Sequence, residues 1–332
     1  MRSCVSLTEL VFLDGLRLLL SDFASTRDAY GETLVHLGKK NEDIVVLDAD
    51  TSSSTRTKLF AEAFPERFFN IGIAEQNLIG IAAGLARCGK IPFASSFSVF
   101  IPGKCVDQVR NAVAYPRLNV KIVSTHSGVT IGADGATHQA IEDIAIMRAI
   151  PNMTVIVPAD AVETRSAINA IEEYLGPVYV RLCRQSTPII YDDDHEYALG
   201  KGITLTDGSD AAIIACGVEV AEALKAAEEL SKEDISVKVI DMHTIKPVDK
   251  ELIVKTAKET GAIVTAEDHN VIGGLGGAVA EVLAEHYPVP MRRIGVNDMF
   301  GESGETHELM AKHGLTAADI EQKVKDVMIR KR

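Results

Sequence analysis

The sequence predicts an α/β fold organised as two doubly wound domains, the second smaller than the first. Short β-branched runs alternate with helical segments along most of the 332 residues, a pattern typical of mainly parallel sheets covered by helices. That alternation breaks once, in the polar and Asp-rich segment 185–202, and then starts again. At roughly 150 residues per domain, a chain of this length also provides about two domains.

The first alternation predicts five strands and at least two long helices. The expected strands are 44–47, 92–95, 120–124, 154–157 and 178–182, and the expected helices include 75–86 and 161–174. Short apolar runs of this kind are typical of strands buried on both faces. We predict that the first domain spans 24–190 and that a linker follows at 191–202.

The second alternation predicts a domain at 203–332. Its expected strands are 211–215, 237–241 and 263–266, and its expected helices are 218–230, 250–259, 277–286 and a last one from Ala317. The glycine-rich sequence at 273–277 lacks the GxGxxG spacing, because Val279 stands at the third position, so it predicts a tight turn. Residues 1–23 have three interpretations: an N-terminal extension, a disordered segment or a start-site artefact.

Composition excludes several classes of function. The formal net charge is −13, which repels nucleic acid and anionic membranes, so neither is an expected partner. The five cysteines include no CxxC pair, which indicates a reduced, cytoplasmic protein. No run approaches the roughly 20 apolar residues of a membrane span. Charges interrupt the apolar stretch near the N-terminus, so we expect no targeting segment.

The reactive side chains of the first half follow its strands. Ligands in open α/β sheets bind beyond the carboxyl ends of the strands, where helix N-termini point inward. The segments that follow the expected strands are 48–54, 97–100, 125–128, 158–160 and 183–185, with His138 in the loop after His126. The second half offers fewer groups at this position: Cys216, His243 and 267–269. We therefore expect the site on the first domain.

Several of these side chains also have an ordinary structural interpretation. Glu75 suits the first turn of a helix, where a carboxylate complements the helix dipole. Phe97 and Phe100 suit core packing. Arg184 suits an ion pair with the acidic run at 192–194. From these local patterns alone, the structural interpretation is favoured for Glu75 and Arg184.

The loop at 132–139 holds an acid and a histidine four residues apart, flanked by glycines. Asp134 and Gly135 fit a turn, with His138 as a helix cap or a surface residue. No third partner stands at a metal-ligand spacing, so we expect no metal bound by this chain.

Six motifs occur in a fixed order along the chain. They are TRDAYG at 26–31, VLDAD at 46–50, FNIGIAEQN at 69–77, SSFSVF at 95–100, GADGATHQ at 132–139 and RLCRQ at 181–185. Together they resemble the C-terminal half of transketolase, especially the split form in which two short chains replace one long chain. The resemblance covers about residues 24–330, and its ordered motifs make it specific. It favours a catalytic role for Glu75.

The resemblance implies a thiamine-diphosphate pyrimidine-binding domain followed by the smaller transketolase C-terminal domain. It also implies that thiamine diphosphate is shared with an N-terminal partner subunit, which carries a GDG signature and holds the diphosphate with Mg²⁺ or Ca²⁺. This sequence contains no GDG. We therefore expect half an active site on this chain, in an assembly with two copies of each subunit.

By the same resemblance, Glu75 lies beside a ring nitrogen of the aminopyrimidine and takes part in its proton transfer. Phe97 and Phe100 match the aromatic pocket around that ring, and Asp50 lies next to the cofactor. Longer transketolases add a tyrosine slightly downstream, where this chain has PGKCV at 102–106. The third wall of the pocket is left unassigned.

The resemblance implies transfer of a two-carbon ketol unit from a ketose phosphate to an aldose phosphate, as in the pentose phosphate pathway. Asp134 matches a residue that hydrogen-bonds a hydroxyl of the donor sugar. His138 matches one that contacts the hydroxyls around the reacting carbons and aids proton transfer. The residues implied to hold the sugar phosphate are Arg27, Ser54, His126 and Arg184. The planar fork of arginine suits a phosphate.

Three alternatives remain open. The β subunit of a thiamine-dependent 2-oxoacid dehydrogenase has the same two-domain plan, but its substrate has no phosphate for Arg27, His126 and Arg184 to bind. Deoxyxylulose-phosphate synthase shares the IAEQ core at 73–76 and is usually one long chain. A non-catalytic assembly subunit would keep the fold without needing the site residues.

Overall fold

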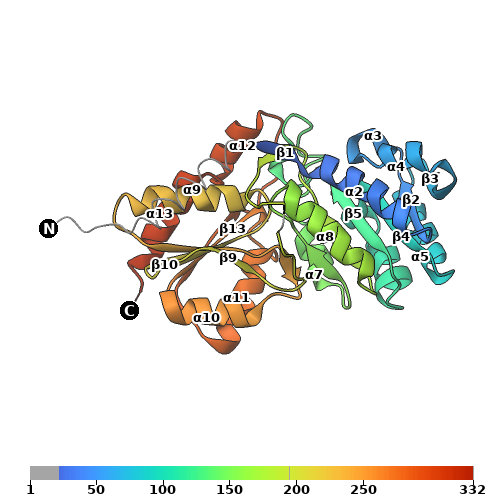
Figure 1. Cartoon of the computed structure of the whole chain (residues 1–332). Helices are drawn as coiled ribbons and strands as arrows, with labels where there is room; N and C mark the ends of the chain where they lie inside the picture. Colours follow the sequence, from blue (N-terminus) through green and yellow to red (C-terminus); the bar gives the residue numbers. More distant parts are fainter. Residues whose placement is uncertain (1–21, 194, 332) are drawn as a thin grey trace.

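The computed structural model describes residues 22–193 and 195–331 of the chain. Figure 1 shows two lobes side by side, each with a sheet between helices. Both sheets are mainly parallel, which confirms the predicted α/β fold of two successive units. Of the predicted N-terminal extension, residues 1–21 lie outside the described part of the chain, and Phe23 begins the strand β1.

The first sheet has seven strands, and every strand except the edge strand β12 runs parallel to its neighbours. In spatial order they are β12 (Thr244–Lys246), β6 (Thr154–Ile156), β7 (Val178–Arg181), β5 (Lys121–Thr125), β4 (Ile91–Phe97), β2 (Ile44–Asp48) and β3 (Phe68–Asn70). All five strands predicted for the first half are present. Almost all of their residues, the polar ones of β4 and β5 included, are buried because helices cover both faces.

Alternate residues of these strands point to opposite faces. The helices of this half are α2 (Thr26–Lys40), α3 (Ser52–Thr55), α4 (Lys58–Ala63), α5 (Glu75–Arg87), α6 (Phe100–Lys104), α7 (Asp143–Ala149) and α8 (Ala161–Glu173). Shorter helical segments complete it: η1 (Pro65–Arg67), the π-helix η2 (Gln108–Ala114) and η3 (Val129–Ile131). On one face of the sheet, Val46 packs in a cluster with α2, α4 and α8; on the other, Leu47 packs with α5, α7 and η2.

The second sheet has five strands, with β9 as its one antiparallel member. In spatial order they are β14 (Met291–Val296), β13 (Ile263–Asn270), β10 (Ala211–Ala215), β11 (Val237–Asp241) and β9 (Ile203–Thr206). Its helices are α9 (Glu219–Ser231), α10 (Lys250–Thr260), α11 (Leu275–His286), α12 (Thr306–His313) and α13 (Ala317–Met328). The predicted strands and helices of this half are all present, within a few residues at their ends.

The two units share a strand and a core. Strand β12 comes after the linker in sequence, yet it pairs with β6 of the first sheet, Thr244 opposite Ile156. The Lys246 ammonium fixes it by donating to the carbonyls of Arg148 (2.8 Å) and Ile150 (2.6 Å). One continuous apolar cluster extends from α7 in the first unit to α10 and α11 in the second. The chain therefore folds as two interlocked units.

Helix α2 was not predicted, although its ends carry signals. Ser25 caps its N-terminus by accepting from the backbone NH of Asp28 (3.2 Å), and Lys39 and Lys40 lie in its last turn. Threonines and glycines interrupt the apolar periodicity between these ends, so the period alone does not indicate a helix. Near it, β1 (Phe23–Ser25) pairs with β8 (Ser186–Pro188), which lies inside the polar break at 185–202.

Candidate active site

The predicted site residues lie at the carboxyl edge of the first sheet. Phe97 is the last residue of β4, and His126 follows β5 directly. Arg184 comes three residues after β7, and Arg27 lies in the first turn of α2, where the β1–β8 ribbon delivers it. Because parallel strands end at the same edge, segments distant in sequence meet there.

Four rings form a cluster at this edge. Phe97 stacks on His126 with ring centroids 3.9 Å apart, and on Phe100 at 5.7 Å. His138 meets both phenylalanines edge-on, at 6.4 Å from Phe97 and 5.5 Å from Phe100. Each of the four is buried or half-buried. The two phenylalanines are thus packed against each other and against both histidines at this edge.

His126 is held as a neutral imidazole. Its Nδ1 lies 2.7 Å from the Thr125 hydroxyl, and its φ of +60° belongs to a region that residues other than glycine rarely adopt. Burial, followed by the positive charges of Arg27 and Arg184, lowers the pKa of His126 to about 3. At neutral pH it is therefore a hydrogen-bonding group, and the two arginines supply the positive charge beside it.

Arg27 and Arg184 form a pair of cations near His126. Arg27 donates to the Ser54 carbonyl (2.8 Å), and Arg184 donates to the Ile131 carbonyl (2.9 Å). Burial and the neighbouring Arg56 and Arg184 lower the pKa of Arg27. Its Nε is buried without a hydrogen-bond partner in the described residues. Like charges held together at a half-buried edge favour an anionic ligand.

In its described residues, Asp192 and Asp193, the acidic run does not supply the ion pair that local sequence suggested for Arg184. Within the described part of the run, Asp193 pairs with Arg165 at 3.0 Å. The Arg184 guanidinium instead reaches the η3 turn. Both arginines lie close enough to His126 for their charges to lower its pKa.

Glu75 is the first residue of α5, and its side chain is only 7% exposed. Ala74 at the N-cap makes no side-chain cap, so the carboxylate lies where the helix dipole favours a negative charge. Both of its oxygens lie 3.3 Å from the Lys104 ammonium. That ammonium is 4.3 Å from the centre of the Phe100 ring. Glu75 therefore reaches the ring cluster through Lys104.

Three predicted residues lie outside this contact network. Asp134 is exposed in the turn before His138. Asp50 is also exposed and accepts from the Asn70 side chain at 3.0 Å. Ser54 meets Arg27 through its backbone carbonyl, and no described contact uses its hydroxyl. For these three, the structure gives a position at the edge without a partner that explains a role.

Lys104 was missed at the sequence level. A helical spacing signal could have found it, because Phe100 and Lys104 begin and end α6 and are four residues apart. Side chains at this spacing lie on the same face of a helix. Its position falls inside 102–106, the segment where the third wall of the predicted pocket was left unassigned.

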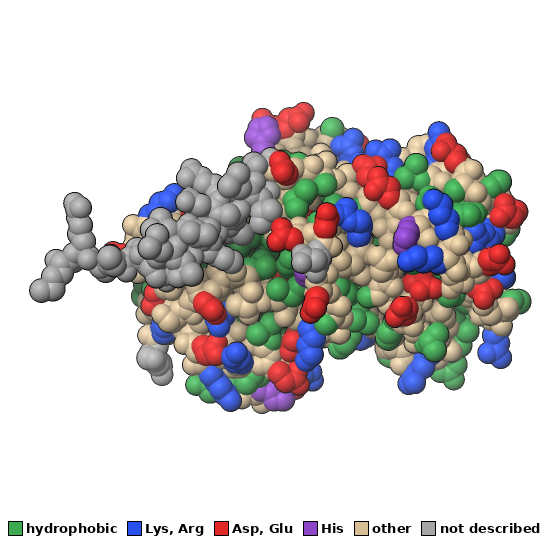
Figure 2. All heavy atoms as spheres, in the orientation of Figure 1, with side chains coloured by type: hydrophobic (Ala, Val, Ile, Leu, Met, Phe, Trp, Pro, Cys, Tyr) green, Lys and Arg blue, Asp and Glu red, His purple; other side chains and the backbone are tan. Residues whose placement is uncertain are grey.

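Beyond this edge, we considered the surface charge, possible metal sites and possible membrane-spanning helices. Figure 2 shows acidic and basic side chains interspersed over the face that it presents. Within residues 22–193 and 195–331, no cluster of three or more His, Cys, Asp or Glu side chains is placed to hold a metal ion. None of the helices described is long and apolar enough to cross a membrane.

Comparison with known proteins places the two units. The family model described as "Transketolase, pyrimidine binding domain" matches residues 23–189, and "Transketolase, C-terminal domain" matches 200–320. The chain belongs to the transketolase family. It corresponds to the C-terminal section of transketolase, because the two matched domains follow each other in that order.

Other split members of the transketolase family are similar over nearly their whole length. A "Putative transketolase C-terminal section" from Methanocaldococcus jannaschii is 55% identical, over 92% of this chain and 97% of its own. One of the subunits of an apulose-4-phosphate transketolase from Phocaeicola vulgatus is 42% identical, over 90% and 95%. The solved structure titled "Split gene transketolase, inactive beta4 tetramer" superposes with a TM-score of 0.88 and 54% identity, over 93% and 99%.

The edge fits the pyrimidine end of the cofactor that this family uses. Glu75 provides a buried carboxylate at a helix N-terminus. Phe100 and Phe97 provide stacked aromatic rings beside it. A flat heteroaromatic ring with hydrogen-bond donors needs this combination, a carboxylate for its edge and rings for its face.

Proposed function

We propose that this chain is the C-terminal subunit of a two-chain transketolase that transfers a two-carbon ketol unit from a ketose phosphate to an aldose phosphate. The observation that carries the proposal is that two sets of side chains, suited to two kinds of ligand group, lie at the same edge of the first sheet. Glu75, Phe97 and Phe100 suit a pyrimidine ring, and the cations Arg27 and Arg184 suit a phosphate. A single ligand-binding edge of this kind serves a cofactor and a sugar phosphate together.

At the cofactor end, Glu75 is proposed to accept a hydrogen bond from the pyrimidine ring and to hold a proton there, with Phe97 and Phe100 against the ring. Asp50 is proposed to lie nearby. Thiamine diphosphate, when bound, supplies the electron sink for breaking a carbon–carbon bond. Its diphosphate, with Mg²⁺ or Ca²⁺, is assigned to an N-terminal partner subunit, because the GDG signature for that end does not occur in this sequence.

At the substrate end, Arg27 and Arg184 are proposed to bind the sugar phosphate, with Ser54 as a further donor. His126, being neutral, contributes a hydrogen bond to a sugar or phosphate oxygen. His138 is proposed to contact the hydroxyls near the reacting carbons and to move a proton, and Asp134 to select the donor sugar through a hydroxyl.

The arginine pair favours this function over a 2-oxoacid dehydrogenase subunit, because a 2-oxoacid substrate carries no phosphate. Two relatives are named for sugars with a strongly anionic group: the apulose-4-phosphate transketolase, and a "6-deoxy-6-sulfo-D-fructose transketolase subunit" from Clostridium sp., 47% identical over 92% of this chain. They support an anionic substrate and leave the individual sugar open. A non-catalytic assembly subunit would have no use for buried, unpaired donors at this edge.

The test is co-purification of the chain with its N-terminal partner, followed by an assay with xylulose phosphate and ribose phosphate. We expect turnover only when both chains, thiamine diphosphate and Mg²⁺ are present. Turnover by this chain alone would sink the two-chain proposal. Turnover of pyruvate in place of the sugars would favour the dehydrogenase alternative.

A matched pair of variants tests the role of Glu75. Glu75→Ala in the two-chain enzyme is expected to lower kcat by roughly a hundredfold or more, in the range of a lost acid–base group. Glu66→Ala removes a carboxylate that is 70% exposed, in η1, and is expected to leave kcat within twofold. Equal rates for the two variants would remove Glu75 from the mechanism.

A further inference from the structure

The Lys104 side chain lies between the two groups that suit a pyrimidine ring. Its ammonium is 3.3 Å from each Glu75 oxygen and 4.3 Å from the centre of the Phe100 ring. Its own backbone carbonyl accepts from the Gln76 side chain at 2.9 Å, which holds the end of α6 against the start of α5. The ammonium thus donates to the carboxylate and lies against the aromatic ring at once.

These contacts are the ones that an aminopyrimidine would make. A ring N–H or amino group would donate to Glu75 as the ammonium does, and the ring would stack on Phe100 where the cation now interacts with its π-face. The pyrimidine ring and the Lys104 ammonium cannot contact the Glu75 carboxylate and the face of the Phe100 ring at the same time. Binding of the ring at this position therefore requires the ammonium to leave.

Exposure shows which partner can move. The Glu75 side chain is 7% exposed and the Lys104 side chain 49%. A carboxylate buried to this extent is costly to leave unpaired. A lysine reaches its partner through a flexible four-carbon stem and is strongly hydrated in water. Lys104 can therefore turn into solvent at low cost, whereas Glu75 is fixed in the first turn of α5.

We propose that Lys104 is a displaceable plug of the pyrimidine site: it neutralises Glu75 while no cofactor is bound, and it swings into solvent when the pyrimidine ring takes its place. This inference rests on the proposed function, because it assumes that Glu75 and Phe100 receive the ring. The plug keeps the half-site electrically satisfied in the free subunit and weakens cofactor binding by the strength of the contacts that must break.

The experiment measures binding of thiamine diphosphate by calorimetry, in the two-chain complex with Mg²⁺ and without substrate. Lys104→Met keeps most of the stem and removes the charge, and it is expected to lower the Kd for thiamine diphosphate by roughly three- to tenfold, the strength of a partly exposed ion pair with a cation–π contact. Lys104→Arg keeps the charge and should leave Kd close to the wild-type value.

Salt distinguishes a plug from a general change in the site. Screening weakens the Lys104–Glu75 pair, so the ratio of wild-type Kd to Lys104→Met Kd should fall toward 1 as salt is raised. The matched control is Lys90→Met, which removes another lysine–carboxylate contact, Lys90 to Asp43 at 2.9 Å, outside the site. It should leave Kd unchanged at every salt concentration.

Two results would overturn the plug. Weaker binding by Lys104→Met would show that the ammonium stays and contacts the bound cofactor, and an unchanged Kd would show that the ion pair does not compete with the ring. In both cases wild-type binding leaves the proposed function standing. Failure of the wild-type complex to bind thiamine diphosphate would remove the proposed function together with the plug.

Discussion

The two sheets of this chain end in opposite ways at their carboxyl edges. At the first edge, half-buried arginines lie near the ring cluster, and the Arg27 Nε has no hydrogen-bond partner among the described residues. At the second edge, Asp268 and Glu267 are fully or nearly buried, and backbone groups occupy their carboxylates. Both edges carry polar and titratable side chains. At Asp268 and Glu267, unlike at Arg27, neighbouring groups already use the polar atoms that a ligand would need.

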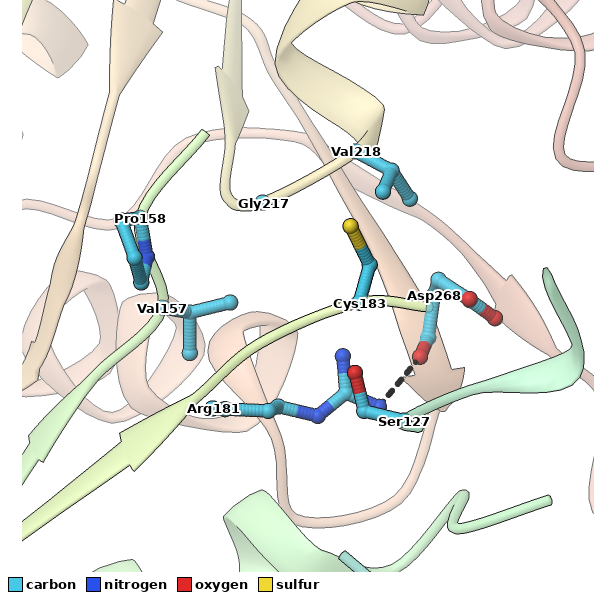
Figure 3. Close-up of a pocket in the computed structure, with 8 residues that line it drawn as sticks. All are labelled: Ser127, Val157, Pro158, Arg181, Cys183, Gly217, Val218 and Asp268. Carbon is cyan, nitrogen blue, oxygen red and sulfur yellow. Dashed lines mark hydrogen bonds between the residues drawn. The ribbon is translucent and has the colours of Figure 1, made fainter. Parts of the chain in front are cut away.

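The second edge is used to hold the two units together. The Asp268 carboxylate accepts from the backbone NH of Val129 (2.9 Å) and the hydroxyl of Thr130 (2.6 Å). The backbone carbonyl of Asp268 accepts from Arg181 at 2.8 Å. Figure 3 shows this bond beside the small pocket at the contact between the two units, which is called the joint below. Glu267 accepts from the first two NH groups of α11 instead. Asp268 therefore stabilises the loop that follows His126 on the first edge, whereas Glu267 stabilises the start of α11.

The largest expected effect is a loss of stability when a buried ion pair at this joint is broken. Arg181 is 5% exposed; its Nε pairs with Asp143 at 2.8 Å, and it also donates to the carbonyls of Ala140 and Asp268. Arg181→Met leaves the Asp143 carboxylate, 1% exposed, without its cation. We expect the free energy of unfolding to fall by about 3–5 kcal/mol, measured by denaturant titration.

Arg184→Met is the matched control, because Arg184 lies three residues further along the same segment, at the carboxyl edge of the first sheet. Arg184 makes one described hydrogen bond, to Ile131, so its loss should change the free energy of unfolding by less than about 1 kcal/mol. In the two-chain enzyme it should raise KM for the sugar phosphate by roughly tenfold or more, the range of a lost charged hydrogen bond. Equal losses of stability at 181 and 184 would contradict the contrast between the edges.

A second variant tests the contact between the two units. Gly128 has φ of +72°, and a Cβ there would overlap the Asp268 carboxylate. We expect Gly128→Ala to lower the free energy of unfolding by about 2–4 kcal/mol, from overpacking and backbone strain together. Gly72→Ala controls for strain alone, because Gly72 has φ of +75° with no atom described within 4 Å of its Cβ position. It should cost about 1–2 kcal/mol; equal costs would show that the contact is loose.

A third prediction concerns a pair of buried carboxyl groups across the joint. Burial raises the pKa of Asp241, at the end of β11, from 3.8 to about 7, and it also raises the pKa of Glu163 in α8. The titratable groups that face the pair include Asp160, Tyr191, His195, Tyr197 and Cys216. Tyr191 donates to Asp241 at 2.8 Å.

Because the folded pKa of Asp241 is raised, the native state holds a proton that the unfolded chain releases. Its stabilisation is therefore present at low pH and declines between about pH 4 and pH 7, with a slope of up to about 1.4 kcal/mol per pH unit. His243, whose pKa burial lowers to about 3, opposes this below pH 6.5. The difference in unfolding free energy between the wild type and Asp241→Asn isolates the carboxyl, and it should shrink as pH rises from 5 to 7.5. A difference that grows with pH would reverse the assignment.

The smallest expected effect concerns the contact of the second unit with the loop of His138. The Thr306 hydroxyl donates to the Thr130 carbonyl (3.1 Å) and accepts from Gln185 (3.0 Å). Gln139 donates to the Glu302 carbonyl nearby, at 2.9 Å. Thr306→Val keeps the shape and should cost about 1 kcal/mol of stability. We expect KM for the donor sugar to rise by roughly two- to fivefold, since the loop that bears Asp134 and His138 loosens.

Thr206→Val is the control, because the Thr206 hydroxyl also makes one donated and one accepted bond, to Val237 and from Val239, at the far edge of the second sheet. It should lose similar stability with an unchanged KM. A rise in KM for both variants would mean that lost stability, and not the loop contact, controls substrate binding.

Much of the fold could be predicted from local pattern. The bounds of β10 and β11 coincide with the predicted 211–215 and 237–241, because each is a short and mostly apolar run, as is typical of a buried strand. Helix α2 was missed because capping, rather than apolar period, marks it. Strand β12 is three residues long and includes a lysine, so it carries no local signal for joining the first sheet.

The candidate site was also predicted in part from the sequence. Residue types after each strand, together with motif order, were enough to predict where the rings, histidines and arginines lie. They were not enough to show that Arg181 is buried against Asp143, that His126 is neutral, or that Lys104 contacts Glu75. Each of these depends on burial and on partners distant in sequence, such as the Asp268 that meets Val129 across 139 residues. The sequence determined which groups reach the edge; tertiary packing decided which of them are left unpaired, because burial sets both the cost of a charge and the partner that satisfies it.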